Sequence, residues 1–319
     1  APVFAQKMAT VNVVQIFGTV DPAKVNDYTE YMAAVNMYEA LTTLDSSGSI
    51  KPLLAESWDV SADTLTYTFK LKSGATFQDG SPVEAKDVVY SVNRLLALNE
   101  GPSYLFEGVL DENSVSAVGN DKVEFKLKKV YTPFLTNTPI LFVVNSDVAE
   151  ANKTSSDPWA QDFIANNTIG AGAFKMTNWE RGATMTMERY TGYHLGWGSD
   201  AIDKVRFVVT NEEATVKALA ASGELSMSSD AQAQETYESI GKMDNYRIES
   251  YATASKFYLK LNHQVAPTDD VHIRKAIAYA TDYNTIRAAL LPGEPLAGPL
   301  PPVFAEAYLD DLELPTYDL

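Results

Sequence analysis

The chain has 319 residues, with 25 Lys and Arg against 42 Asp and Glu, so its formal net charge is −17. This acidity argues against a nucleic-acid-binding protein and against adhesion to anionic lipid, because both depend on cationic side chains. Cysteine is absent, which excludes a disulfide framework, thiolate catalysis and a cysteine-ligated zinc site.

The N-terminal residues predict a processed end followed by a strand. Val3-Phe4-Ala5 has the small-residue pattern of a signal-peptidase site, and we interpret it as the remnant or immediate neighbour of a removed signal peptide. Residues 10–17 are apolar and β-branched, which predicts a strand that ends at the turn of residues 18–22. No apolar run reaches the roughly 18 residues that a membrane span needs.

Residues 28–44 predict a helix. Their apolar side chains recur at helical spacing and include Met32, Met37 and Tyr38. A stripe of Met and Tyr at this spacing is more often core than ligand-binding surface, so we interpret it as core.

Residues 53–96 predict a strand, a turn and a long helix. Apolar and polar side chains alternate over residues 65–72, which is typical of a half-buried strand. The Asp-Gly dipeptide at 79–80 predicts a tight turn. Ser81 is the predicted helix cap, because Glu84 follows it at the spacing of a capping box.

The same segment carries a series of residues in the order typical of one protein family. The matching positions are Trp58, Tyr67, Thr68, Phe69, Leu71, Gly74, Phe77, Asp79, Gly80, Pro82, Ala85, Asp87, Val88, Ser91 and Arg94. In this order they resemble the signature region of the extracellular solute-binding proteins of family 5. These are the oligopeptide, dipeptide and nickel type, which serve ABC importers.

The resemblance implies an α/β fold, namely a two-lobed periplasmic binding protein of class II, in its large three-subdomain form with a hinge between the lobes. Residues 1–28 and 151–254 would form the cleft-bearing subdomain of lobe I, and residues 29–150 its accessory subdomain. Residues 255–319 would begin lobe II, which is incomplete because the family continues well past this point. We therefore expect the natural protein to extend beyond Leu319.

Later segments also resemble family elements, with departures. Residues 169–174 carry two glycines in alternate positions, but nothing after them completes a phosphate-binding loop. Residues 179–188 predict a hairpin. Residues 189–196 resemble the family's Arg-Asn-x-x-Tyr-Trp-Gly element, with His194 in place of the tryptophan.

The polar residues beside the later helices are interpreted as caps. Residues 205–209 predict a strand, after which Asn211 would cap a helix that Gly223 ends. Asp269 and Asp270 are neighbouring carboxylates, but they precede a helix whose free N–H groups they would satisfy. We interpret them as capping residues and not as a catalytic pair.

The resemblance assigns the first candidate ligand-binding residues to Phe17, Gly18 and Tyr104. In the family the backbone of the first strand borders the ligand cleft, which corresponds here to Phe17 and Gly18. In peptide-binding relatives a tyrosine near position 104 faces the ligand. The alternatives are that Phe17 is a core aromatic and that Tyr104 is packed on the surface.

Ser229 and Asp230 correspond to cleft-lining positions of peptide-binding relatives. Asp230 would either receive a cationic or hydroxyl-bearing ligand or cap the helix that follows it. Residues 246–262 contain a predicted strand that, by resemblance, crosses into the second lobe. Lys256 and Tyr258 follow the crossing, where a tyrosine of the relatives reaches the ligand.

The function that the resemblance implies is that of a periplasmic receptor for an ABC importer, which closes its lobes around a solute. Peptide is the default ligand, and an opine, a sugar or a metal chelate are alternatives, as is a chemosensory role. We expect a monomer that docks transiently on a membrane permease, without cofactor, metal or nucleic acid. An enzyme is not supported, because hydrolase motifs are lacking and the only histidines are His194, His263 and His272.

Overall fold

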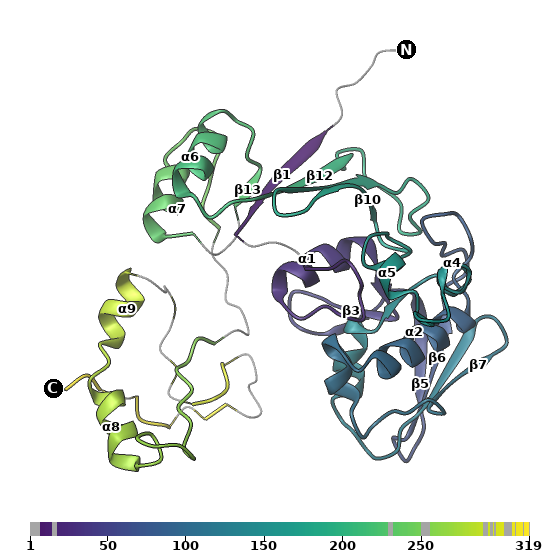
Figure 1. Cartoon of the computed structure of the whole chain (residues 1–319), viewed down its shortest axis with the longest axis horizontal. Helices are drawn as coiled ribbons and strands as arrows, with labels where there is room; N and C mark the ends of the chain where they lie inside the picture. Colours follow the sequence, from purple (N-terminus) through teal and green to yellow (C-terminus); the bar gives the residue numbers. More distant parts are fainter. Residues whose placement is uncertain are drawn as a thin grey trace. The chain divides into compact units, whose positions relative to one another are not determined.

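The computed structural model describes residues 7–14, 18–228, 232–249, 256–289, 293, 296, 298–302, 308–309, 311–314 and 316–318. The chain divides into two compact units, Ala1–Ala231 and Gln232–Leu319. The first unit holds the sheets of the described chain and the second holds short helices (Figure 1).

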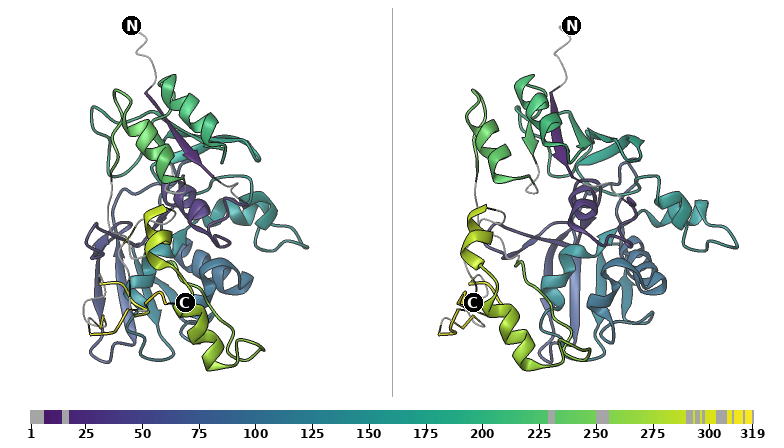
Figure 2. Two further views of the ribbon diagram at one scale, coloured as in Figure 1. Left: turned by 90° about the vertical axis from the view of Figure 1, so that its left-hand side faces the viewer. Right: turned by 60° about the vertical axis from the view of Figure 1, so that its left-hand side comes forward.

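The first unit contains two larger sheets that lie apart from each other (Figure 2). One has five strands in the order β10-β11-β12-β1-β13. These strands are β1 (Met8–Val13), β10 (Phe174–Glu180), β11 (Thr184–Arg189), β12 (Lys204–Val209) and β13 (Met227–Ser228). β1 pairs in parallel with both β12 and β13, while β10 and β11 form an antiparallel hairpin. The predicted hairpin and the predicted strand at 205–209 are therefore confirmed.

The second sheet is antiparallel, with the order β5-β6-β8-β7. Its strands are β5 (Ala55–Val60), β6 (Thr66–Leu71), β7 (Val115–Val118) and β8 (Lys122–Lys126). Tyr67, Phe69 and Leu71 of β6 are buried, as the alternation predicts, and α2 (Ala85–Leu98) supplies Val88, Val92 and Leu95 to the same core. Small strands and short helices complete this unit: β2 (Glu39–Ala40), β3 (Thr42–Leu44), β4 (Ile50–Pro52), β9 (Phe142–Val143), η1 (Gly101–Phe106), α3 (Phe134–Asn137), η2 (Thr138–Ile140), α4 (Ser146–Asn152), α5 (Gln161–Ile164) and α6 (Glu213–Ala221).

The start of α2 corrects the prediction from sequence. Ser81 does not cap the helix, because its N–H and hydroxyl both donate to Asp79 Oδ1, at 2.9 and 2.6 Å, within the turn. Glu84 is the N-cap instead and forms a capping box with Asp87. The spacing of Ser81 and Glu84 predicts a capping box three residues before the real one, because Ser81 is hydrogen-bonded within the preceding turn instead.

The helix predicted over residues 28–44 is also too long. α1 covers Tyr28–Met37, with Asp27 as its cap, and the chain then becomes extended in β2 and β3. β2 pairs with β9, which is distant in the sequence, and β3 pairs with β4, which follows it after a turn. Partners outside the segment override its helical periodicity here.

The end of α6 is as predicted but its start is not. Glu212 occupies the N-cap position where Asn211 was expected, and neither of these residues makes a side-chain cap bond among the described contacts. Gly223 follows the C-cap residue Ser222 and has φ +76°, a left-handed conformation that glycine adopts without strain.

Gly170 and Gly172 stand where the chain passes close to the end of α1. A Cβ on Gly172 would lie 2.6 Å from Asn36 O and 2.7 Å from Tyr38 N. The main-chain N–H of Gly172 donates to Met37 O at 3.1 Å, so the two backbones are in direct contact. The glycines at 169–174 therefore serve close backbone packing, which explains their spacing without a phosphate ligand.

Gly172→Ala is expected to lower the free energy of unfolding by about 1–3 kcal/mol, because backbone atoms must move to admit the methyl group. Gly198→Ala is the matched control, since a Cβ there meets nothing within 4 Å and its φ is not in the left-handed range. Urea unfolding followed by Trp fluorescence measures both. Equal stability of the two variants would contradict the close-packing role.

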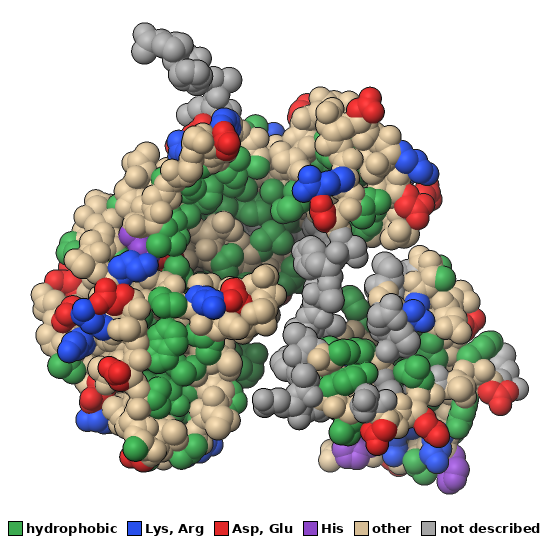
Figure 3. Space-filling model, turned by 180° about the vertical axis from the view of Figure 1, so that it is seen from behind, with side chains coloured by type: hydrophobic (Ala, Val, Ile, Leu, Met, Phe, Trp, Pro, Cys, Tyr) green, Lys and Arg blue, Asp and Glu red, His purple; other side chains and the backbone are tan. Residues whose placement is uncertain are grey.

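The second unit contains α7 (Gln234–Gly241), α8 (Val271–Tyr279) and α9 (Tyr283–Ala289). Asp270 caps α8 by accepting from His272 N at 2.8 Å, which confirms its capping role. The described parts of 246–262 contain no strand, contrary to expectation. Neither α8 nor α9 has a buried residue, and hydrophobic side chains lie open on the face that Figure 3 shows. No described helix has the length and apolar character needed to cross a membrane.

Candidate ligand-binding edge of the central sheet

Three parallel strands of the five-stranded sheet end at the same edge. β12, β1 and β13 are neighbours and run in parallel, so their carboxyl ends, at Val209, Val13 and Ser228, lie side by side. In open α/β sheets, ligands bind beyond the carboxyl ends of the strands. This edge is therefore the candidate site of the first unit.

The side chain of Asn12 connects the ends of the three strands by hydrogen bonds. Its side chain is fully buried, and Nδ2 donates to Thr210 O at 2.8 Å, just beyond β12. Ser228 Oγ, at the end of β13, donates to Asn12 Oδ1 at 3.3 Å. One amide thus ties the central strand to both neighbours, which fixes the spacing of the chain segments that leave the edge.

Gly18 lies in the segment that leaves β1 and is held from two sides. Its N–H donates to Glu30 Oε1 of α1 at 3.1 Å, and its carbonyl accepts from Arg181 Nη1 at 3.3 Å. Glu30 Oε2 also accepts from Asn26 N at 2.8 Å. A Cβ at Gly18 would lie only 2.7 Å from Glu30 Oε1. The N–H of Gly18 is thus already engaged, which leaves its carbonyl as the group that has a further lone pair for a ligand.

Arg181 lies at the tip of the β10–β11 hairpin and links three segments. Its guanidinium lies over the Trp179 ring, 3.9 Å from the centroid, and Nη2 donates to Asn166 Oδ1 at 2.7 Å. Stacking on an aromatic face and forked hydrogen bonding are properties of Arg that Lys does not share. The sequence predicts a hairpin over residues 179–188, but nothing local in it indicates a bond from Arg181 to a residue as distant as Gly18.

The turn after Gly18 is anchored by a buried ion pair. Arg94 of α2 binds Asp21 in a bidentate manner, with Nη1–Oδ1 at 2.7 Å and Nη2–Oδ2 at 2.6 Å, and both side chains are almost fully buried. Arg94 Nε donates to Trp159 O at 2.9 Å. Asp21 Oδ1 also accepts from Ala23 N at 3.0 Å. These bonds satisfy both charged groups, as a buried pair requires.

The remaining predicted residues lie on different elements. Tyr104 is in η1, which begins beside the same turn, since Lys24 pairs with Glu100 at 3.2 Å. Its side chain points into solvent, because 70% of the residue is exposed. Lys256 and Tyr258 belong to the second unit, where the Lys256 ammonium donates to Gly298 O and Tyr258 is exposed. The other candidates, Phe17, Ser229 and Asp230, lie outside the described residues.

A second polar cluster contains His194, which replaces the tryptophan expected from the resemblance. Glu39 Oε2 lies 2.6 Å from His194 Nε2, and Glu39 Oε1 accepts from Tyr193 OH at 2.6 Å. Burial and the Glu39 carboxylate raise the pKa of Tyr193 far above its usual value. The side chains of Glu39 and His194 are 3% exposed, and His194 Nδ1 is buried without a partner among the described atoms. Among the residues that the structure describes, no three His, Cys, Asp or Glu side chains are grouped so that they could hold a metal ion.

Residues 49–319 of the chain match the family model for the middle part of the bacterial extracellular solute-binding proteins, family 5. Among curated proteins, it is 27% identical over 292 residues to the probable D,D-dipeptide-binding periplasmic protein DdpA of Escherichia coli K12. That match covers 89% of this chain and 55% of DdpA. The chain thus spans little more than half the length of this relative.

Solved structures show the same fold. The oligopeptide-binding protein AppA of Bacillus subtilis, in complex with a nonapeptide, superposes with a TM-score of 0.84 at 24% identity. The periplasmic binding protein DppA of Helicobacter pylori, in complex with a peptide, gives 0.83 at 25% identity. Each match covers 98% of this chain, but only 62% of AppA and 64% of DppA.

Proposed function

The chain belongs to the bacterial extracellular solute-binding proteins of family 5, and from this premise we propose that it is the receptor of an ABC importer, with peptide as its ligand. The family match over residues 49–319 carries this proposal. The sheet edge at Val13, Val209 and Ser228 supports it, because it is the part of such a sheet where ligands bind. We infer binding and not catalysis.

We propose the division into lobes that the sequence suggests. Residues 1–28 and 151–254 would carry the cleft face of lobe I, residues 29–150 its accessory subdomain, and residues 255–319 the beginning of lobe II. A ligand that contacts both lobes only when they are closed shifts the population toward the closed state. Gly18 would contribute its carbonyl, and Phe17, Ser229 and Asp230 are the other proposed contacts of lobe I.

The proposed peptide ligand rests on what similar proteins bind. DdpA is named for a D,D-dipeptide, and the DppA structure contains a peptide. An extended peptide offers main-chain groups that pair with strand edges, while its side chains occupy separate pockets. Tyr104, Lys256 and Tyr258 are the proposed side-chain contacts. An opine, a sugar or a metal chelate is the competing ligand class, and a chemosensory receptor is the competing role.

The proposed setting is the periplasm, where relatives such as DdpA are located according to their names. We infer that a signal peptide directs the protein there and is removed. It would act as a monomer that docks transiently on a membrane permease. The net charge of −17 is compatible with this setting, because it keeps a dilute receptor soluble and apart from anionic lipid.

Native mass spectrometry of the protein purified from its own host tests the ligand class. We expect a ladder of peptide masses released on denaturation. A ligand at a hundredfold its Kd should then add about 2.7 kcal/mol to the stability of stripped and refolded protein, measured as a rise in Tm. Release of one defined small molecule instead of peptides would show that the protein is a receptor specialised for that compound. Absence of any ligand, with no Tm shift from peptides, opines, sugars or metal chelates, would contradict the receptor function.

A further inference from the structure

A groove of about 480 Å³ lies in the first unit, and its lining includes none of the residues that end β1, β12 and β13. Its size falls within the range of roughly 300–1,000 Å³ that small-molecule sites occupy. It is lined by β10 with the turn after it and by three segments, within residues 77–79, 145–148 and 163–169. The groove therefore belongs entirely to one compact unit of the chain.

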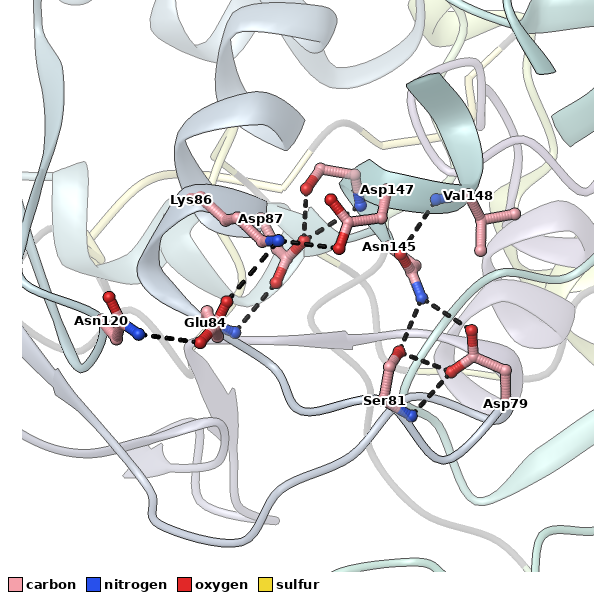
Figure 4. A network of polar contacts seen from close by, with 10 residues as sticks. Asp79, Ser81, Glu84, Lys86, Asp87, Asn120, Asn145, Asp147 and Val148 are labelled. Atoms are coloured by element: carbon pink, nitrogen blue, oxygen red, sulfur yellow. Dashed lines mark hydrogen bonds and ion pairs between the residues drawn. The ribbon is translucent and has the colours of Figure 1, made fainter. Parts of the chain in front are cut away.

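Hydrogen bonds between the lining segments fix the shape of the groove. Asn145 Nδ2 donates to Asp79 Oδ2 at 3.0 Å and to Ser81 Oγ at 2.9 Å, as Figure 4 shows. Arg181 Nη2 donates to Asn166 Oδ1 at 2.7 Å, which joins the turn after β10 to the segment beyond α5. The groove is therefore a built part of the fold, and its shape does not depend on a ligand.

Lys175 of β10 brings an uncompensated positive charge into the lining. Among the described residues, no hydrogen bond or ion pair engages its ammonium group. Glu188 lies directly opposite Lys175 across the hairpin, but it pairs with Lys204 at 2.6 Å. The ammonium group is thus available to a ligand.

The other charged groups of the lining leave it positive. The described hydrogen-bond acceptors of Arg181 are two main-chain carbonyls and the Asn166 amide oxygen, all of them neutral. Asp79 is the carboxylate of the lining, and its oxygens accept from neutral donors. Lys175 and Arg181 against Asp79 give the lining one net positive charge, in a chain whose net charge is −17. A groove of this sign attracts an anion.

The neutral side chains of the lining add apolar surface and a few polar groups. Phe163, Met176 and Trp179 supply the apolar surface. Thr168 and Asn178 supply a hydroxyl and an amide, which can donate and accept hydrogen bonds. Apolar lining with few polar groups is typical of sites for small molecules. The lining thus suits a ligand that has both an anionic group and an apolar part.

We propose that this groove binds a small organic carboxylate, whose anionic group pairs with Lys175 and whose apolar part lies against Phe163 and Trp179. One negative charge matches the net charge of the lining, whereas a dianion such as phosphate would leave excess negative charge near Asp79. Charge-assisted bonds from an ammonium to a carboxylate are roughly twice as strong as neutral hydrogen bonds. The site goes beyond the function proposed above, because it uses neither the carboxyl edge of the sheet nor the second unit.

Titration with phenylacetate, compared with its neutral analogue phenylacetamide, tests the proposal. We expect phenylacetate to bind at low millimolar concentration or below, and phenylacetamide to bind about tenfold or more weakly. The indole N–H signal of Trp179 in NMR spectra, assigned by its loss in Trp179→Phe, should shift on binding and so place the ligand in the groove. Binding should weaken as NaCl is raised from about 50 to about 500 mM, because salt screens a partly exposed ion pair.

Lys175→Gln removes the proposed partner of the anion and should weaken binding of phenylacetate by about tenfold. Lys175→Arg keeps the charge and should bind within about threefold of the native chain. Lys129→Gln is the matched control, because Lys129 is also exposed, lies outside the lining and changes the net charge equally.

Native affinity in Lys175→Gln, or equal weakening by Lys175→Gln and Lys129→Gln, would overturn the proposal. Equal binding of phenylacetate and phenylacetamide, an unshifted Trp179 signal, or no binding of phenylacetate up to about 10 mM would each overturn it as well.

Discussion

Arg94→Met is expected to lower the free energy of unfolding by about 3–5 kcal/mol. The substitution leaves the Asp21 carboxylate without its partner, and this carboxylate is fully buried. An uncompensated buried charge costs far more than the loss of one hydrogen bond, since no water can replace the guanidinium. Urea unfolding, followed by Trp fluorescence, measures the loss as a lower midpoint.

Two controls separate this effect from ordinary loss of charge. Lys70→Met removes an exposed ion pair with Glu56 and should cost less than about 1 kcal/mol. The double variant Asp21→Leu with Arg94→Met removes both buried charges and should recover part of the stability that the single variant loses. The single variant Asp21→Leu completes the comparison. If the double variant lost as much stability as the sum of the losses of Arg94→Met and Asp21→Leu, the two side chains would not be coupled and the interpretation would be wrong.

Glu39→Ala is expected to lower the free energy of unfolding by about 2–5 kcal/mol, because it leaves two polar groups of a partly buried cluster without their partner. These are the Tyr193 hydroxyl and His194 Nε2, each 2.6 Å from a Glu39 oxygen. The cluster lies beside Trp197, whose ring is 5.6 Å from that of Tyr193, so the emission of Trp197 should report local loosening. Chemical unfolding and Trp emission together measure the change.

Glu39→Gln keeps the shape and one acceptor of the native side chain, and so should lose less stability than Glu39→Ala. Glu150→Ala is the control for an exposed carboxylate, whose pair with Lys153 is about half exposed, and should cost under about 1 kcal/mol. A loss for Glu39→Ala no larger than that of Glu150→Ala would show that the cluster does not stabilise the first unit.

The sheet strands were predictable wherever a local pattern matched a buried face. Alternation over residues 65–72 corresponds to β6, and Met185 with Met187 points into the core from β11. The helix start at Ser81 was wrong, because Asp79 uses the serine within the turn. The helix over 28–44 was wrong as well, since β4 and β9 pair with its second half.

The candidate site was predictable only in part. Gly18 was identified through the family resemblance, and the structure holds it by hydrogen bonds to Glu30 and Arg181. Glu30 and Arg181, which hold it there, were not identified, because Glu30 reads as an ordinary surface residue of a helix and Arg181 as part of a turn. The division of lobes at residues 254 and 255 stays a prediction, as do the roles of Tyr104, Lys256 and Tyr258.

By itself, the sequence determined the family, the acidic character and the local elements whose residues lie within one turn or one strand of each other. Only the tertiary structure decided the bonds of Arg181 to Gly18, of His194 to Glu39 and of Asn12 to Thr210, because each joins residues more than 150 positions apart. It also decided that β10 is an edge strand beside a groove. Periodicity reports which face of an element is buried, but strand order depends on which distant segments pack together.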